Sequence, residues 1–302
     1  MTRAAPSLPG GIVPMLYAFF RADGALDLGA FERQARACVG AGVDGLAVLG
    51  LATEVVKLSA DERIALLGAA AQAARDRVPL SVTVFGNTPE EQIAFVREAE
   101  RAGAASVVLQ PPRTPGISEP DLTAFFGRVL DAASIPAGIQ NAPEYIGIGL
   151  GVESIAALAK RHPNFRILKG EGSAMLIRRT VEQTGGALTV LNGRGGLELP
   201  DNRAAGCAGM IPGAECCDVL ARIWHGLGGD DAARAHALRE YAVALPLLVF
   251  LMQSMDQFLC YGKRLMARRL GLGEVHDRAP AQAPTPWGLD CLERHAAFLG
   301  PL

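Results

Sequence analysis

Residues 41–50 read AGVDGLAVLG, in which small residues and glycine end one element and an apolar run begins the next. The same pattern returns at AGAAS (102–106), TGGAL (184–188) and AGCAG (205–209). Glycine at such a place ends a helix in the left-handed conformation before the chain turns into a strand. Short runs rich in Val, Ile and Leu are typical of parallel strands that are buried on both faces. The pattern therefore predicts helices and strands in alternation.

Eight apolar runs can be placed as strands, and each is followed by a stretch with helical spacing. The expected strands are residues 12–19, 43–49, 80–85, 106–109, 137–141, 166–169, 188–191 and 207–211. Two helix starts carry capping boxes, Ser59 with Glu62 and Thr88 with Glu91, and Pro89 stands at the first helical position of the second. Eight βα units in series with right-handed crossovers favour an α/β fold, a (β/α)8 TIM barrel.

A doubly wound sheet is the alternative fold, and a dinucleotide-binding loop would support it. GIGLGV (147–152) is the glycine cluster that could form such a loop, but it lacks the G-x-G-x-x-G spacing and an acidic residue placed for a ribose. We therefore interpret it as a plain loop that enters a helix.

The pattern changes to helices alone after residue 228, with expected helices at 230–255, 255–270 and 288–298. We divide the chain into a catalytic barrel, 1–228, and a C-terminal helical extension, 229–302. The basic run KRLMARRLG (263–271) is typical of a solvated or subunit-facing helix surface. The apolar stretch YAVALPLLVFLMQSM (241–255) favours a homo-oligomer, because it exceeds what one solvated helix normally exposes.

Composition favours a small-molecule partner. The 302 residues are half apolar, with a net charge of −2 and a pI of about 6.2, so no overall field attracts nucleic acid or an anionic membrane. No hydrophobic run approaches the roughly 20 residues that span a bilayer, and the N-terminus lacks the apolar segment of a secretion signal, so we expect a cytoplasmic protein. The six cysteines form no C-x-x-C pair, which disfavours a zinc site and favours buried free thiols.

The stretch FRILKGEGS (165–173) ends an apolar strand in Lys169, in a chain with four lysines among 29 basic residues. Arginine stays charged at any working pH, whereas a desolvated lysine amine can lose its proton and attack a carbonyl. The last residue of a barrel strand lies at the mouth where barrel enzymes keep their reacting groups. The alternative is a strand-end lysine whose amine reaches solvent.

Several short motifs occur in an order that carries a family resemblance. They are GLATE (50–54), IQNAPEYIG (139–147), ILKGEGS (167–173), NGRGG (192–196) and CAGMIPGAE (207–215). Together they resemble the dihydrodipicolinate synthase and N-acetylneuraminate lyase family, from about Gly11 to the C-terminal helices. The resemblance implies a class I lyase in which Lys169 forms a Schiff base with pyruvate or another small 2-oxo acid.

The resemblance also implies substrate contacts and an assembly. Backbone amides of Ala52 and Thr53 would hold the substrate carboxylate, and Gly193 and Ile211 would line the substrate site at the ends of strands seven and eight. No metal or organic cofactor is needed for this chemistry. Members are commonly tetramers built as pairs of dimers, so we expect a homotetramer or a dimer.

The family's proton relay is interrupted in this chain. The usual G-T-T-G-E motif reads Gly50, Leu51, Ala52, Thr53, Glu54, and the usual tyrosine of Y-N-x-P is Gln140. Losing a positioned acid–base group typically costs on the order of 10² to 10⁴ in rate. We therefore do not expect dihydrodipicolinate synthase activity itself, and the arginine of that enzyme that would hold the second carboxylate also falls on Tyr145.

Other groups are candidates to replace the missing phenol. Tyr17 comes first, because its phenol would project at the mouth, although a strand tyrosine more often fills a core. Gln140 can orient water or a substrate oxygen but cannot accept a proton. Tyr145 and Glu171 are weaker candidates.

Three further polar residues have a functional and a structural interpretation. Arg113 would pair with a second substrate carboxylate or point into solvent. Asn141 would bind substrate or fix the turn before Pro143. Glu54 is explained by the helix dipole and loop amides, and we interpret it as structural.

The leading hypothesis is thus a lyase of aldolase or dehydratase type that acts on a small 2-oxo acid. The alternative is a barrel that binds 2-oxo acids without turnover, as a regulatory protein. A third reading is an unrelated barrel enzyme with a phosphate site after strands seven and eight, where glycines would permit one.

Overall fold

A computed structural model describes residues 8–302, apart from the side chains of Glu144 and Tyr145. Eight parallel strands form one sheet in the order β1-β8-β7-β6-β5-β4-β3-β2. They are β1 Gly11–Ile12, β2 Leu46–Val48, β3 Leu80–Val84, β4 Ser106–Leu109, β5 Ala137–Asn141, β6 Phe165–Gly170, β7 Thr189–Asn192 and β8 Gly209–Met210. A parallel bridge between Met15 and Ala47 joins the first strand to the second and closes the sheet. The (β/α)8 barrel prediction is confirmed.

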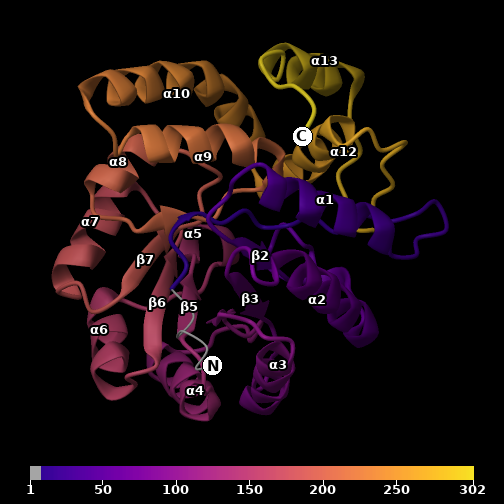
Figure 1. Cartoon of the computed structure of the whole chain (residues 1–302). Coiled ribbons are helices and arrows are strands. Elements are labelled where there is room, and N and C mark those ends of the chain that lie inside the picture. The colour runs from indigo at the N-terminus through magenta and orange to yellow at the C-terminus, as the bar shows by residue number, and fades with distance from the viewer. Residues whose placement is uncertain (1–7) are drawn as a thin grey trace.

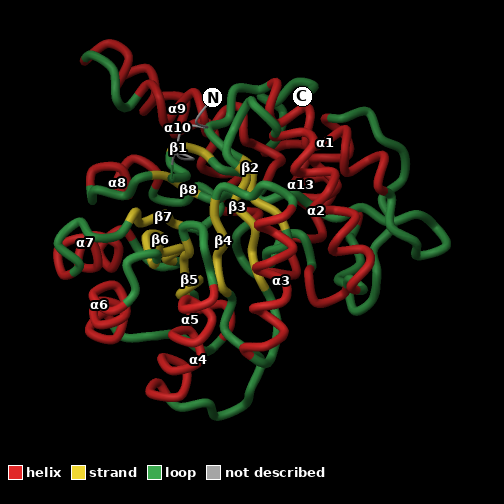
Figure 2. The backbone as a smooth tube through the Cα atoms, turned by 60° about the horizontal axis from the view of Figure 1, so that its bottom comes forward, coloured by secondary structure: helices red, strands yellow, loops and turns green. Residues whose placement is uncertain are grey.

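Helices surround the strands on the outside of the barrel (Figure 2). They are α1 Leu28–Gly40, η1 Val55–Lys57, α2 Ala60–Ala74, α3 Pro89–Arg101, α4 Glu119–Ala132, α5 Pro143–Ile146, α6 Val152–Arg161, α7 Ala174–Gln183, α8 Leu199–Ala204, η2 Ala214–Cys216 and α9 Cys217–Gly226. Both expected capping boxes are present, at the N-termini of α2 and α3. Each satisfies backbone donors that a helix start leaves unpaired.

The first and last strands are shorter than expected, and proline explains the difference at the first. Pro14 has no amide hydrogen to donate, so the ladder after β1 continues only through single bonds such as Met15 N to Pro212 O at 2.7 Å. The last strand is two residues long, although Ala208 and Ile211 beside it still donate to carbonyls of β7 residues, at 2.8 Å each.

The C-terminal extension comprises α10 Asp231–Leu251, α11 Met255–Gln257, the π-helix η3 Phe258–Gly262, α12 Lys263–Arg269 and α13 Pro286–His295. Figure 1 shows α10 lying along α9, with α12 and α13 grouped beyond it. Its turn after α10 reaches the barrel, because Met252 and Phe258 line the same cavity as strand-end residues. The division of the chain at residue 228 stays a prediction.

The basic run 263–271 is not the solvated surface that we expected. Lys263 is fully buried and bonds to Glu54, with Asp277 at 3.4 Å. Arg269 is 4% exposed and makes a bidentate pair with Asp218 at 2.8 Å. The expectation was wrong because sequence spacing does not reveal partners that lie far away along the chain.

All six cysteines are buried free thiols, as expected. In residues 8–302 no single helix is long and apolar enough to cross a membrane, although Asp231–Leu251 and Met255–Arg269, bent by 109°, meet the length and composition criteria together.

Candidate active site

Lys169 lies at the carboxyl end of β6 and lines a small pocket, here called the Lys169 cavity, of about 30 Å³. Its walls come from strand ends, their loops and the C-terminal extension: Met15, Leu51, Ala52, Lys169, Glu171, Gly193, Gly195, Ile211, Pro212, Gly213, Met252, Met255 and Phe258. The structure thus brings together four of the residues expected in the site, Lys169, Ala52, Gly193 and Ile211.

The Lys169 amine is paired with a carboxylate. Its Nζ lies 2.6 Å from Oε1 of Glu171, and both residues are 4% exposed. Charges so deeply buried require a close partner, since desolvation is otherwise costly. The amine therefore does not extend to solvent, and the alternative of a snorkelling lysine does not describe this structure.

Glutamine side chains form a chain of hydrogen bonds that ends on this carboxylate. Gln140 Nε2 donates to Glu171 Oε1 at 2.8 Å, and Gln110 Nε2 donates to Gln140 Oε1 at 2.9 Å. Gln92 Nε2 in turn donates to the backbone carbonyl of Gln110 at 2.7 Å. All three glutamines are buried, so this chain fixes which way the Gln140 amide faces.

Glycine at position 193 is required by a close approach. A Cβ there would lie 2.6 Å from Glu171 Oε1 and 2.9 Å from Lys169 Cε. A side chain at this place would therefore displace the Lys169–Glu171 pair.

The loop after β2 lines the cavity with Ala52 and carries two backbone amides, those of Ala52 and Thr53, that have no partner among the described residues. The Thr53 hydroxyl holds the loop, because it donates to the Leu16 carbonyl at 2.6 Å and accepts from the Leu49 amide at 2.9 Å. Buried unpaired amides are rare, and a carboxylate is a suitable acceptor for both.

Glu54 ends this loop, and its carboxylate pairs with two lysines rather than with the loop amides that we expected. Lys57 Nζ lies 2.6 Å from its Oε1, and Lys263 of α12 bonds to its Oε2. This buried cluster ties the loop that carries the two amides to the C-terminal extension.

Tyr17 does not reach the Lys169 cavity. Its hydroxyl donates to Glu215 Oε2 at 2.7 Å, and both side chains are fully buried. Burial, together with the neighbouring Glu215 carboxylate, raises the pKa of Tyr17 well above its usual value, and burial also raises the pKa of Glu215. Gly213 and Phe258 line the cavity and contact Tyr17. The contacts are those of the core tyrosine that was the alternative interpretation.

Asn141 fixes a loop. Its Nδ2 donates to the Leu150 carbonyl at 3.0 Å, and its Oδ1 accepts from the Leu150 amide at 2.8 Å. The glycine cluster 147–152 accordingly leads into α6, as expected for a plain helix-entry loop. The side chain of Tyr145 lies outside the described residues.

Arg113 lines a second cavity of about 390 Å³, beside the first. Its walls are Leu51, Phe85, Gln110, Pro111, Pro112, Arg113, Thr114, Pro115, Ile146 and Ile148. Leu51 also lines the Lys169 cavity, so it forms a partition between the two spaces. The Arg113 guanidinium lies 5.9 Å from the centre of the Phe85 ring.

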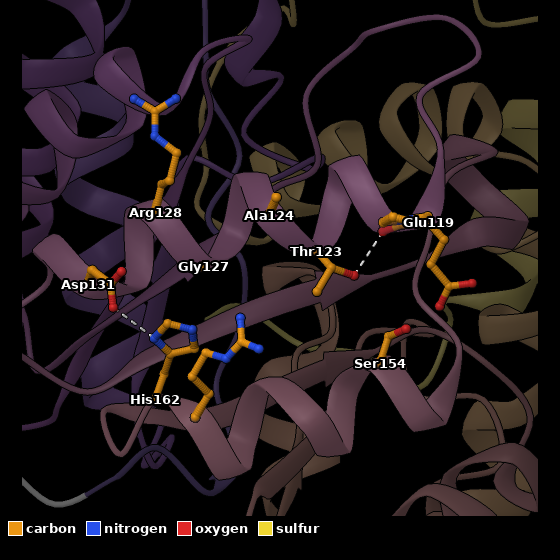
Figure 3. A pocket seen from close by; sticks show the side chains of 10 residues that line it. Glu119, Thr123, Ala124, Gly127, Arg128, Asp131, Ser154 and His162 are labelled. Atoms are coloured by element: carbon orange, nitrogen blue, oxygen red, sulfur yellow. Dashed lines mark hydrogen bonds and ion pairs between the residues drawn. The ribbon is translucent and has the colours of Figure 1, made fainter.

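A larger cavity, of about 640 Å³, lies on the outside of the barrel between α4 and α6 (Figure 3). His162 Nδ1 lies there 3.0 Å from Asp131, and Thr123 donates to the Glu119 carbonyl at 2.8 Å. None of its lining residues lines the Lys169 cavity. Since barrel enzymes react at the carboxyl ends of their strands, size alone does not identify the active site here.

Sequence reasoning undervalued Glu171 and missed the residues from the extension. A signal for Glu171 was available, because an acidic residue follows two places after the strand-end lysine. Met252, Met255 and Phe258 gave no signal, since nothing local indicates that their segment reaches the mouth.

Fold and site together define a (β/α)8 barrel whose buried lysine and free amides meet at the carboxyl ends of the strands. The family model described as "Dihydrodipicolinate synthetase family" matches residues 8–227, and the chain belongs to this family.

Relatives with several activities are similar to the chain. It is 27% identical to 4-hydroxy-tetrahydrodipicolinate synthase of Rhizobium meliloti, over 96% of this chain and 99% of that protein. It is 29% identical to L-2-keto-3-deoxyarabonate dehydratase of Azospirillum brasilense, over 82% and 81%. The structure of YagE from E. coli K12, a complex with pyruvate, superposes with a TM-score of 0.87 at 26% identity, over 96% of this chain and 98% of that one.

Proposed function

We propose that this protein is a lyase that forms a Schiff base between Lys169 and pyruvate or another small 2-oxo acid. The observation that carries the proposal is the buried Lys169 side chain that lines a small cavity at the end of β6. Family membership, a dehydratase relative and a pyruvate-bound neighbour support a pyruvate-linked lyase. Dihydrodipicolinate synthase activity itself is not proposed, because Leu51, Ala52 and Gln140 offer no hydroxyl for a proton relay.

The site residues have separate tasks in this proposal. The amides of Ala52 and Thr53 hold the 2-oxo acid carboxylate, so that its C2 carbonyl faces Lys169. The neutral amine attacks C2, water leaves, and the resulting iminium acts as an electron sink. A carbon–carbon or carbon–oxygen bond beta to the iminium carbon is then broken or formed through an enamine.

Substrate entry requires side chains to move. A cavity of about 30 Å³ has room for only one or two water molecules, whereas pyruvate has six heavy atoms. Met252 and Met255 line the cavity, and the unbranched methionine side chain rearranges easily. Once Leu51 shifts, the second cavity offers space for the rest of a longer substrate, and Arg113 there pairs with a second carboxylate.

The Lys169–Glu171 ion pair supports a second candidate, a barrel that binds 2-oxo acids without turnover, because the pair engages the amine that would have to react. In that reading the Lys169–Glu171 pair stays closed, and the bound acid contacts only the amides. The two candidates differ in whether a covalent bond to Lys169 forms.

Borohydride reduction tests the proposal. The protein is incubated with pyruvate and with a panel of 2-oxo acids, reduced, and analysed by intact mass and peptide mapping. We expect one adduct, on Lys169, and none in the Lys169→Arg variant. The control is Lys160→Arg, which replaces an exposed lysine of α6 and should leave the adduct unchanged. No adduct with any acid of the panel would refute Schiff-base chemistry, and binding that persists without it would favour the second candidate.

Two further expectations belong to this proposal. We propose a homo-oligomer, dimer or tetramer, because α10 exposes Leu238, Val243 and Val249. Light scattering of the purified protein tests the oligomeric state. The Val243→Lys variant should associate more weakly than the wild type. The cytoplasmic location is likewise proposed, and cell fractionation tests it.

A further inference from the structure

Glu171 is the only acidic side chain among the described residues that line the Lys169 cavity. Its Oε1 contacts the amine that the proposed function requires to be neutral, at 2.6 Å. The described residues give Oε2 no hydrogen-bond partner, so this oxygen is available to a substrate. The carboxyl group therefore touches the nucleophile and borders the space where C2 and C3 of the substrate would lie.

We propose that Glu171 is the general acid and base of this site and does the work of the missing phenol. This inference rests on the proposed Schiff-base function and adds its proton acceptor. A carboxyl group within hydrogen-bond reach of the reacting atoms meets the geometric requirement for such a role.

Each proton in the sequence can be followed. Glu171 first takes a proton from the Lys169 ammonium, which leaves a neutral amine and a carboxylic acid. The amine attacks C2, and after one proton passes from nitrogen to oxygen a neutral carbinolamine is formed. Glu171 then donates its proton to the carbinolamine hydroxyl, which leaves as water, so that an iminium and the Glu171 carboxylate remain.

The same carboxylate serves the following step. It removes a proton from C3 of the iminium, which gives the neutral enamine and restores the carboxylic acid. No oxidant, reductant or metal enters the balance. In the reverse direction the acid returns the proton to C3.

Gln140 is a positioning residue in this scheme. Its Nε2 holds Glu171 Oε1 at 2.8 Å, and its Oε1 is occupied by Gln110 at 2.9 Å. The amide therefore donates to the carboxylate and has no basic atom to offer a substrate. Tyr17 is the rival proton acceptor, but its hydroxyl is engaged with Glu215.

Exchange of the pyruvate methyl protons for deuterium separates these roles. Exchange needs both the iminium and a base at C3, and proton NMR in D₂O follows it directly with pyruvate as the probe. We expect the wild type to exchange and Glu171→Gln to exchange slower by on the order of 10² to 10⁴. Glu171→Asp should retain part of the rate, because it keeps a carboxylate. Glu182→Gln, which replaces an exposed glutamate of α7, is the control and should exchange at the wild-type rate.

A pH profile distinguishes catalysis from a purely structural effect. The exchange rate is measured across a range of pH for the wild type and for Glu171→Gln, and a general base predicts that the substitution changes the shape of the profile as well as its height. Circular dichroism of each variant checks that the barrel is folded.

The outcomes separate the two proposals. If the wild type forms the Lys169 adduct and Glu171→Gln exchanges at the wild-type rate, the role of Glu171 is refuted and the Schiff base stands. If Tyr17→Phe abolishes exchange and Glu171→Gln does not, Tyr17 is the proton acceptor in place of Glu171. If the wild type forms no adduct, the proposed function fails and this inference with it.

Discussion

The Glu54→Gln substitution should destabilise the protein strongly, because Glu54 is the shared partner of the fully buried Lys263 and the partly buried Lys57. Lys263 is fully buried and bonds to one carboxylate oxygen, while Lys57 lies 2.6 Å from the other. An amide keeps the shape but removes the negative charge. Breaking a buried ion pair by removing one partner costs about 3 to 5 kcal/mol.

The remaining partners place this substitution at the lower end of that range. Lys263 keeps Asp277 at 3.4 Å, and Lys57 keeps its bond to the Arg278 carbonyl at 2.9 Å. We therefore expect a loss of about 3 kcal/mol in the free energy of unfolding. The loop with the two free amides should loosen as well, so the variant should also bind 2-oxo acids more weakly.

Urea unfolding followed by the fluorescence of buried Trp224 measures this loss. Glu182→Gln is the matched control, since its exposed pair with Arg178 should contribute less than about 0.5 kcal/mol. The double variant with Lys263→Met should recover much of the stability, because it removes both charges together. A loss below about 1 kcal/mol for Glu54→Gln, or strictly additive effects in the double variant, would refute the reasoning.

Three further predictions concern acid stability and the Lys169 cavity. Hydrogen bonds from Arg278 lower the pKa of Glu62 from 4.5 to about 2. The Glu62–Arg278 pair therefore stabilises the fold above pH 4.5, and this contribution disappears as the pH falls towards 2. The melting temperature of Glu62→Gln should approach that of the wild type over this range, and a constant difference between them would contradict the prediction. Met252→Ala should speed formation of the pyruvate adduct by enlarging the cavity, as stopped-flow trapping would measure; a slower reaction would argue against methionine movement at entry. Gly193→Ala should slow formation of the pyruvate adduct by on the order of 10²-fold, because the new methyl group displaces Glu171. An unchanged rate would show that adduct formation does not depend on the position of the Lys169–Glu171 pair.

The barrel could be predicted from sequence because its signals are local. Glycine stops, capping boxes and short apolar runs each act within a few residues, and all eight strands appear near their expected places. The error at the first strand comes from Pro14, whose missing amide hydrogen shortens the ladder.

The scarcity of lysine proved to be a weak argument for chemistry. Lys263 is more deeply buried than Lys169, and Lys57 is also paired, yet both hold the structure together through Glu54. The position of Lys169 at the end of a barrel strand was the informative observation. Rarity alone would have favoured Lys263 equally.

The surroundings of the site depend on contacts between distant parts of the chain. Tyr17 meets Glu215 across 198 residues, and Lys263 meets Glu54 across 209. No spacing rule reveals such pairs. The expectation that Tyr17 projects into the mouth failed for this reason, and so did the expectation of a solvated basic run.

A crystal structure of the protein soaked with pyruvate shows directly whether Lys169 reacts with a 2-oxo acid. We expect continuous electron density between Lys169 Nζ and C2 of pyruvate, with the carboxylate on the amides of Ala52 and Thr53. Glu171 should lie within hydrogen-bond distance of the bound carbon skeleton or its leaving water. An intact Lys169–Glu171 pair with no covalent density, in crystals where pyruvate has entered the cavity, would contradict this expectation.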